Sequence, residues 1–169
     1  MKQILYMLTA LIIIGSVLEN CVHKRDKDVF TELIEEMVEL AEKRDMTGLM
    51  FYFDQGFSDF QGRGKKEIRE FLLSYLNNYH NPVIHVLGTK IDNLNPGEAD
   101  IQTEIAISSG AARLFRKLVK VALDNYRLKI RFIKNDSSWK VSYAEWRYVS
   151  LDELYPESYA LLKKIFPGI

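Results

Sequence analysis

The apolar residues change their spacing at about residue 82, and no other feature of the sequence constrains the fold as strongly. Before this point they recur at intervals of three and four, the period of a helix packed on one side. After it, apolar and polar residues alternate, the period of a half-buried strand. We therefore predict an α+β fold, with helices followed by consecutive strands. The helices are expected over residues 29–44, 46–52 and 65–79, and the strands over residues 83–94, 99–108, 126–134 and 139–149.

Two stretches of the strand-rich half are less regular. In the last predicted strand the first apolar residues occupy odd positions, whereas Trp146 and Tyr148 occupy even ones. A β-bulge near Ala144–Glu145 would change the facing in this way. Residues 111–122 fit either a strand or a short helix, and a terminal helix is expected over residues 151–165.

Residues 1–21 form a segment of their own. Lys2 precedes residues 4–18, which carry no charge and match the apolar region of a secretory signal. The run is short for a membrane-spanning helix, which needs about 20 apolar residues. We therefore expect a signal peptide or a membrane anchor.

Cys21 lies three positions after Leu18, and this spacing resembles the lipobox of bacterial lipoproteins. In such proteins the signal is cut before the cysteine, which then carries lipid. Glu19 and Asn20 stand where the lipobox has small residues, so two further outcomes stay open: an uncleaved signal anchor, or cleavage and export without lipid. Lipidation of Cys21 or an uncleaved anchor would hold the domain on the membrane, outside the cytoplasm, on the periplasmic side of the cell envelope.

The rest of the chain is predicted to hold a linker and one domain. Residues 22–28 are polar and lack an apolar period, which is typical of a tether. Residues 29–166 carry the predicted helices and strands. A chain of 169 residues suits one domain with a short additional segment.

Charge and cysteine content exclude several classes of function. Lys and Arg number 23 and Asp and Glu also number 23, so the chain lacks the basic surplus that nucleic-acid binding requires. Cys21 is the only cysteine, which excludes an internal disulfide and a thiolate metal cluster. His80 and His85 do not have the spacing of a zinc site. We expect no metal, no cofactor and no nucleic-acid partner.

A basic run extends from Arg113 to Arg131 and includes Arg127 and Lys129. We interpret it as the solvated outer face of a sheet, balanced by acidic residues elsewhere. Contact with anionic lipid headgroups near the tether is the alternative interpretation.

Two segments resemble the nuclear-transport-factor-two-like superfamily, which includes SnoaL-like and ketosteroid-isomerase-like domains. Residues 57–72 (FSDFQGRGKKEIREFL) are similar to its short strand, glycine turn and third helix, and residues 139–146 (WKVSYAEW) to its closing strand. The resemblance implies a cone-shaped, cystatin-like roll in which a curved antiparallel sheet wraps around N-terminal helices. Small bacterial lipoproteins with this domain often end in a sequence similar to residues 144–147 (AEWR).

The same resemblance directs attention to Asp59. In enzymes of the superfamily a carboxylate beside the short strand acts as a general base, and Asp59 occupies the matching position. Such a base needs a raised pKa and a donor for the developing oxyanion. The isomerases take one donor from a tyrosine on the first helix, yet residues 29–44 contain no tyrosine. Alternatively, Asp59 caps the following turn or pairs with Arg63.

Aromatic residues are concentrated in the elements that line the cone in this superfamily. Most of them must form the core, but a few are candidates for an apolar pocket with a polar rim. His85 falls on an apolar face of its predicted strand, as a core residue or as a donor in the pocket. The candidate pocket residues are Tyr52, Phe57, Phe60, Tyr75, His85, Trp139, Tyr143 and Trp146.

Three hypotheses for function follow. The first is an exported, membrane-tethered, non-catalytic domain that binds a small apolar ligand or a protein partner, with homodimerisation through the sheet, as is common in the superfamily. The second is a proton-transfer isomerase or dehydratase with Asp59 as base. The third is an accessory or assembly protein that uses the face of the sheet and needs no pocket.

Overall fold

The computed structural model describes residues 28–109, 124–154 and 156. The chain divides into two units, Met1–Ile34 and Glu35–Ile169. In the first unit the described residues are helical, and Phe30 and Ile34 are buried. Helical backbone extends from residue 28 to residue 42, which confirms the first predicted helix with slightly earlier bounds.

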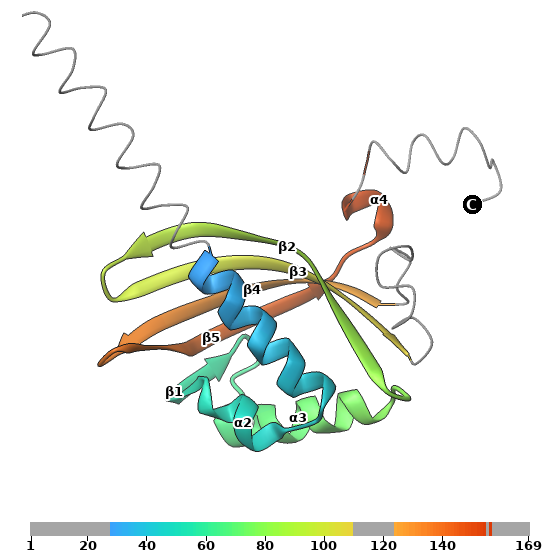
Figure 1. Cartoon of the computed structure of the whole chain (residues 1–169), viewed down its shortest axis with the longest axis horizontal. Coiled ribbons are helices and arrows are strands. Elements are labelled where there is room, and N and C mark those ends of the chain that lie inside the picture. Colours follow the sequence, from blue (N-terminus) through green and yellow to red (C-terminus); the bar gives the residue numbers. More distant parts are fainter. Residues whose placement is uncertain (1–27, 110–123, 155, 157–169) are drawn as a thin grey trace, which may run out of the picture. The chain divides into compact units, whose positions relative to one another are not determined.

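The second unit has the predicted order of helices followed by strands (Figure 1). Its first elements are α2 (Met46–Phe51), β1 (Phe53–Asp59) and α3 (Lys65–Asn77). The remaining elements are β2 (Pro82–Asn95), β3 (Glu98–Ser109), β4 (Asp124–Asn135), β5 (Ser138–Tyr148) and α4 (Leu151–Leu154). α4 coincides with the start of the predicted terminal helix.

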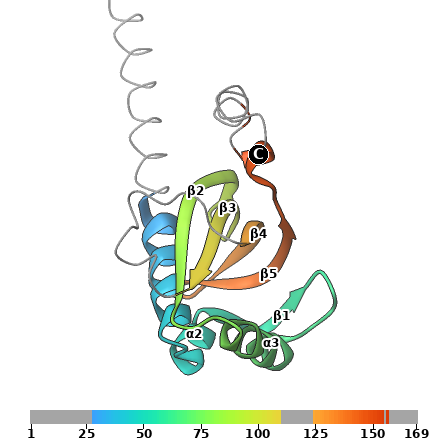
Figure 2. The ribbon, with the colours of Figure 1, turned by 90° about the vertical axis from the view of Figure 1, so that its right-hand side faces the viewer.

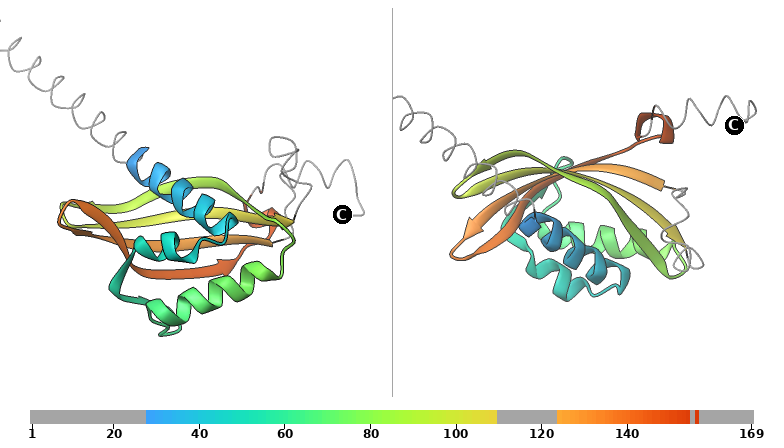
Figure 3. Two further views of the ribbon diagram at one scale, coloured as in Figure 1. Left: turned by 60° about the horizontal axis from the view of Figure 1, so that its bottom comes forward. Right: turned by 45° about the horizontal axis from the view of Figure 1, so that its top comes forward.

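The strands form one sheet with the order β1-β5-β4-β3-β2. Strands β2 to β5 pair antiparallel with their neighbours, whereas β1 lies at an edge and pairs with β5 in parallel. The sheet is strongly curved, and α2 and α3 lie on its concave side (Figures 2 and 3). The predicted α+β fold is therefore confirmed, with one parallel edge strand added to the antiparallel sheet.

The turn before α2 holds two helix ends in place. The side chain of Asp45 accepts a hydrogen bond from the N–H of Gly48 at 2.9 Å and so caps the start of α2. Arg44, which has a φ of 55°, donates from Nη2 to the carbonyls of Leu76 at 3.3 Å and Tyr79 at 2.8 Å. A cation at this position adds a donor to carbonyls at the C-terminal end of α3 and suits the helix dipole.

Three bulge residues change the face of the sheet on which the following side chains lie. Leu87 and Asp92 of β2 have no partner in β3, and Ser142 of β5 has none in β4. Each bulge moves the following side chains to the opposite face relative to simple alternation. The bulge expected near Ala144–Glu145 thus lies earlier, at Ser142, because Tyr143 already belongs to the outer face.

The core lies between the concave face of the sheet and the helices. Its buried side chains include Leu49 of α2, Ile68 and Leu76 of α3, and Ile101, Ile130, Phe132 and Val141 of the sheet. Burying one such side chain stabilises the fold by about 1.5–3 kcal/mol. This packing fixes the face that α3 presents to β4 and β5.

The convex face of the sheet carries charges in pairs. The described cations of the basic run each contact an acid on a neighbouring strand: Arg127 with Glu104 at 2.7 Å, Lys129 with Glu145 at 2.8 Å, and Arg131 with Asp100 at 2.8 Å. For this part of the run, the predicted balance by acids is confirmed.

Several expectations fall outside the described residues. These are the segment 1–21 with Cys21, residues 22–27 of the tether, residues 111–122, and the terminal helix beyond residue 156. Within the described ranges, no helix combines the length and the apolar character needed to cross a membrane.

Candidate functional site

Asp59 ends β1 with its carboxylate turned into a closed set of donors. The residue is 2% exposed. Its Oδ1 accepts from the backbone N–H groups of Gln61 and Arg63, each at 2.9 Å, and its Oδ2 accepts from Nε of Arg63 at 2.6 Å. Gly62, in the middle of this turn, has a φ of 77°, which glycine adopts without steric cost. The carboxylate therefore organises the turn that leads into α3.

These donors also determine the protonation of Asp59. Burial by itself raises the pKa of the carboxyl, but the N–H and guanidinium of Arg63 and the N–H of Gln61 outweigh it, and the pKa lies below its usual value. A general base for a carbon acid needs the opposite shift, together with a lone pair directed at the substrate. Of the two expected roles for Asp59, the geometry favours the turn cap and partner of Arg63.

The guanidinium of Arg63 lies against aromatic rings. Its Cζ is 4.1 Å from the ring centroid of Phe71 and 5.2 Å from that of Trp146. Nη2 is buried and has no hydrogen-bond partner within the described residues, so the faces of these rings provide its electrostatic environment. Since Asp59 already neutralises this cation, Arg63 is poorly suited to bind an anionic ligand.

Six aromatic side chains form a continuous row between α3, the turn after β1, and the strands β4 and β5, and the ring of Tyr79 contacts this row at Tyr75, with 5.5 Å between centroids. We call it the aromatic cluster. Neighbouring ring centroids lie 4.9–6.2 Å apart, within the range of favourable stacked and edge-to-face contacts. In order of contact its members are Phe60, Trp146, Phe71, Tyr75, Tyr126 and Tyr148. The two ends reach solvent, since Phe60 is 44% exposed and Tyr148 is 56% exposed.

Three tyrosine hydroxyls and one carboxylate form a hydrogen-bonded chain at the Tyr126 end of the cluster. We call it the tyrosine chain. The hydroxyls of Tyr126 and Tyr75 are 2.9 Å apart, and those of Tyr75 and Tyr79 are 2.8 Å apart. The hydroxyl of Tyr79 donates to Oδ2 of Asp124. The chain links α3 and the residues after it to the start of β4.

The tyrosines of this chain hold their protons firmly. Burial raises the pKa of Tyr79 to about 12, and its hydrogen bond to Asp124 acts in the same direction. Burial also raises the pKa of Tyr75 and of Tyr126, and the hydrogen bond that each donates along the chain adds to the effect. At neutral pH all three are therefore phenols, able to act as hydrogen-bond donors and acceptors.

The structure brings three of the predicted pocket residues together and separates the rest. Phe60, Tyr75 and Trp146 belong to the aromatic cluster. Phe57, by contrast, is a core residue, 3% exposed and 4.8 Å from the ring of Phe53. Trp139 lies at the hairpin end of β5, with Nζ of Lys134 5.7 Å from its ring centroid.

Tyr52 follows α2, and its hydroxyl donates to Glu36 at 2.8 Å. This hydrogen bond, together with burial, raises the pKa of Tyr52. Tyr52 therefore has a local polar partner and takes no part in the ring contacts of the cluster.

His85 and Tyr143 lie on the face of the sheet opposite to Trp146. In the hydrogen-bond ladder between β5 and β4, Trp146 lies opposite Leu128 on the concave face, whereas Tyr143 lies opposite Arg131 on the convex face. His85 lies two residues before Leu87, the bulge that reverses the alternation, and its Nε2 is 3.5 Å from Oγ of Ser108. This corrects the expectation that His85 and Tyr143 share a pocket with the tryptophan.

The site also contains residues that the sequence did not single out as pocket residues: Phe71, Tyr79, Asp124, Tyr126 and Tyr148. One signal was present, since Phe71, Tyr75 and Tyr79 recur every four residues and so follow one face of α3 and its extension. No comparable pattern marks Asp124, whose position depends on the register of β4.

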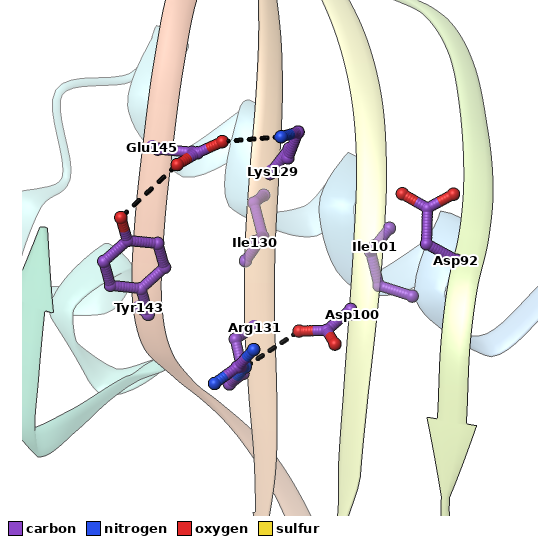
Figure 4. A pocket seen from close by; sticks show the side chains of 8 residues that line it. All are labelled: Asp92, Asp100, Ile101, Lys129, Ile130, Arg131, Tyr143 and Glu145. Atoms are coloured by element: carbon purple, nitrogen blue, oxygen red, sulfur yellow. Dashed lines mark hydrogen bonds and ion pairs between the residues drawn. The ribbon is translucent and has the colours of Figure 1, made fainter. Parts of the chain in front are cut away.

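A shallow groove of about 360 Å³ lies on the convex face and is lined by charged side chains from all four antiparallel strands (Figure 4). Its charges satisfy one another: Glu145 contacts Lys129 at 2.8 Å and the hydroxyl of Tyr143 at 3.4 Å, and Arg131 contacts Asp100. In the part of the chain that the structure covers, no group of three or more His, Cys, Asp or Glu side chains is arranged to hold a metal ion.

Comparisons with known proteins agree with this fold. No protein-family model and no curated protein matches the chain. Bd1075 of Bdellovibrio bacteriovorus aligns over 76% of the chain with a TM-score of 0.59 and 20% identity, and the chain spans only 42% of that protein. A protein of unknown function with a cystatin-like fold from Nostoc punctiforme aligns with a TM-score of 0.58 and 16% identity, over 72% of this chain and 90% of its own.

An NTF2-like protein of unknown function from Pseudomonas putida aligns with a TM-score of 0.58 and 13% identity, over 73% of this chain and 86% of its own. The chain thus has the cystatin-like fold of the NTF2-like proteins. The resemblance stated from residues 57–72 and 139–146 is confirmed at the level of fold.

Proposed function

We propose that the chain is a non-catalytic binding domain, held at a membrane surface outside the cytoplasm, that takes a small, largely apolar ligand on its aromatic cluster. The observation that carries the proposal is the state of Asp59. Three donors occupy its two oxygens at 2.6–2.9 Å, and its pKa is lowered. Asp59, the residue that would act as general base in an isomerase or dehydratase of this fold, is therefore occupied by hydrogen bonds, two of them from Arg63.

The composition of the aromatic cluster supports the choice of ligand. Small-molecule sites combine apolar and aromatic walls with a few placed polar groups. Here the rings of Phe60 and Tyr148 are exposed at the two ends, and the hydroxyls of Tyr75 and Tyr126 supply the polar groups. The convex face is less suited to an apolar partner, because its charges are paired with one another.

Ligand binding is tested by titrating the full chain, in lipid nanodiscs, with 2-methoxynaphthalene and following chemical shifts by NMR, with empty nanodiscs as reference. We expect Phe60→Ala to weaken binding about 5- to 20-fold, because one ring wall is lost. Phe51→Ala is the matched control: Phe51 is also exposed, at 70%, but contacts Lys140 outside the cluster. Absence of binding by the wild type, or equal loss in both variants, would contradict the proposal.

The tether rests on the sequence, namely the apolar residues 4–18 followed by Cys21. Its test is the intact mass of protein purified from bacterial membranes, beside a Cys21→Ala variant. A mass corresponding to cleavage before Cys21 plus acyl chains, absent in the variant, supports lipidation. An unmodified full-length mass supports a retained anchor, and recovery of a truncated, unlipidated chain in the soluble fraction argues against any tether.

A further inference from the structure

The direction of every hydrogen bond in the tyrosine chain follows from its carboxylate end. A carboxylate accepts hydrogen bonds and donates none, and each phenol has a single proton to donate. Tyr79 uses its proton on Asp124. In the 2.8 Å contact the donor must then be Tyr75, and in the 2.9 Å contact the donor must be Tyr126.

This order leaves Tyr126 with its proton engaged and its oxygen open. A phenol oxygen accepts up to two hydrogen bonds. Among the described residues Tyr126 donates to Tyr75 and receives no hydrogen bond in return. The side chain is half-buried and meets the exposed ring of Tyr148 edge-on, with 6.1 Å between centroids. An acceptor therefore lies within the aromatic cluster, next to its solvent-exposed end.

We propose that Tyr126 Oη accepts a hydrogen bond from the ligand, so that the site selects planar apolar molecules carrying an O–H or N–H donor, such as phenols, over those carrying acceptors only. The inference rests on the proposed binding function and adds its polar selectivity. The rings of Tyr75 and Tyr148 meet that of Tyr126 edge-on, at interplanar angles of 82° and 88°, so the acceptor is bordered by aromatic rings, which favour a flat aromatic ligand. Asp124 takes no part in direct contact: it is a positioning residue, which orients the three hydroxyls.

The experiment compares 2-naphthol with its methyl ether, 2-methoxynaphthalene, on the full chain in nanodiscs, with each dissociation constant corrected against empty nanodiscs. The two probes share the ring system, and only the first donates. One added hydrogen bond is worth about 0.5–1.5 kcal/mol, so we expect 2-naphthol to bind about 2- to 12-fold more tightly. Tyr126→Phe is expected to abolish this preference, because the oxygen that accepts from 2-naphthol is removed.

Two further variants separate orientation from folding. Asp124→Asn offers the tyrosine chain both a donor and an acceptor, so its hydrogen bonds no longer run in one fixed direction. The preference for 2-naphthol is therefore expected to fall toward unity. Tyr143→Phe, on the convex face, should keep the full preference. Tyr126 keeps its ring in the phenylalanine variant, and an unchanged near-ultraviolet circular dichroism spectrum of the aromatic rings reports that the cluster is still folded.

The outcomes distinguish the inference from the function on which it rests. A preference for 2-naphthol that disappears in Tyr126→Phe supports the inference. Equal affinities for the two probes in the wild type, or a preference that survives Tyr126→Phe, overturn it while the apolar binding function stands. If the wild type binds neither probe, both proposals are overturned.

Discussion

The guanidinium of Arg44 donates a hydrogen bond of 2.8 Å to the backbone carbonyl of Tyr79, so the turn before α2 holds the last tyrosine of the tyrosine chain in place. The two residues are 35 positions apart. The hydroxyl of Tyr79 in turn donates to Asp124 at the start of β4. One arginine therefore couples the packing of α2 and α3 to the position of a buried hydroxyl in the candidate site.

Arg44→Met should destabilise the protein by about 1–3 kcal/mol, because carbonyls at the end of α3 lose a charged donor in a part-buried position. Chemical denaturation followed by circular dichroism measures the change. Lys43→Met is the control, since Lys43 makes only an exposed pair with Glu39, worth about 0.3–0.5 kcal/mol. Equal effects of the two substitutions would argue against a role for Arg44 in holding the helix end.

Asp59→Asn should lower the free energy of unfolding by about 2–4 kcal/mol, because the substitution leaves the largely buried guanidinium of Arg63 without its counter-charge. Asp92→Asn disrupts an exposed pair with Lys90 and should cost less than about 1 kcal/mol. Under the proposed function the folded fraction of Asp59→Asn still binds 2-methoxynaphthalene. Loss of binding in protein that remains folded would favour a direct role of Asp59 at the site.

The acid limb of the stability curve should also depend on Asp59. Its pKa is lowered in the folded state, so the unfolded state binds more protons as the pH falls. The stabilisation is present above the unfolded pKa of about 4 and is lost as the pH decreases through the lower folded pKa. Urea denaturation between pH 6 and pH 2 should show a shallower decline for Asp59→Asn than for the wild type. Parallel curves would contradict the lowered pKa.

At alkaline pH the free energy of unfolding should change with pH in the opposite direction, because the tyrosine pKa values are raised. Tyr79, with a pKa raised to about 12, and Tyr75 and Tyr126, also raised, keep protons that the unfolded chain releases near pH 10. Their stabilisation is present below about pH 10 and is lost as the pH rises through the folded pKa values. The free energy of unfolding should therefore decrease above pH 10, and less steeply in Tyr79→Phe. Tyrosinate absorbance at 295 nm measures the ionisation, and a protein whose nine tyrosines all titrate near pH 10 while folded would contradict this account.

The periods of the sequence predicted the elements well, because each follows from one face of a helix or strand packing on the core. The facing of single residues was harder to predict. Alternation grouped His85 with Leu87 and Tyr143 with Val141, and the bulge expected near Ala144–Glu145 brought Trp146 to the same face. The bulges lie instead at Leu87 and Ser142, and they put His85 and Tyr143 on the other face. A bulge depends on how a ladder of hydrogen bonds closes, and composition does not encode that directly.

The candidate site shows the same limit. Phe60 and Trp146 came from segments with a recognisable resemblance, and Tyr75 from the apolar stripe of its helix. The partners Tyr126 and Asp124 depend on the register of β4 against α3, which is a long-range property. Likewise, Asp59 was correctly linked to Arg63 as one of two alternatives, but only the geometry shows that all its donors come from its own turn.

The extra residue in β5 makes the strand tolerant to one specific deletion. Val141 and Ala144 face the helices, and Tyr143 between them faces outward, so Ser142 is the position that breaks the alternation. Removing Ser142 would restore a regular ladder and leave every later side chain on its present face, whereas removing a neighbouring residue with the bulge retained would exchange the faces of Glu145 and Trp146. The curvature of the strand can therefore be altered by a single codon deletion that leaves the orientation of its tryptophan unchanged.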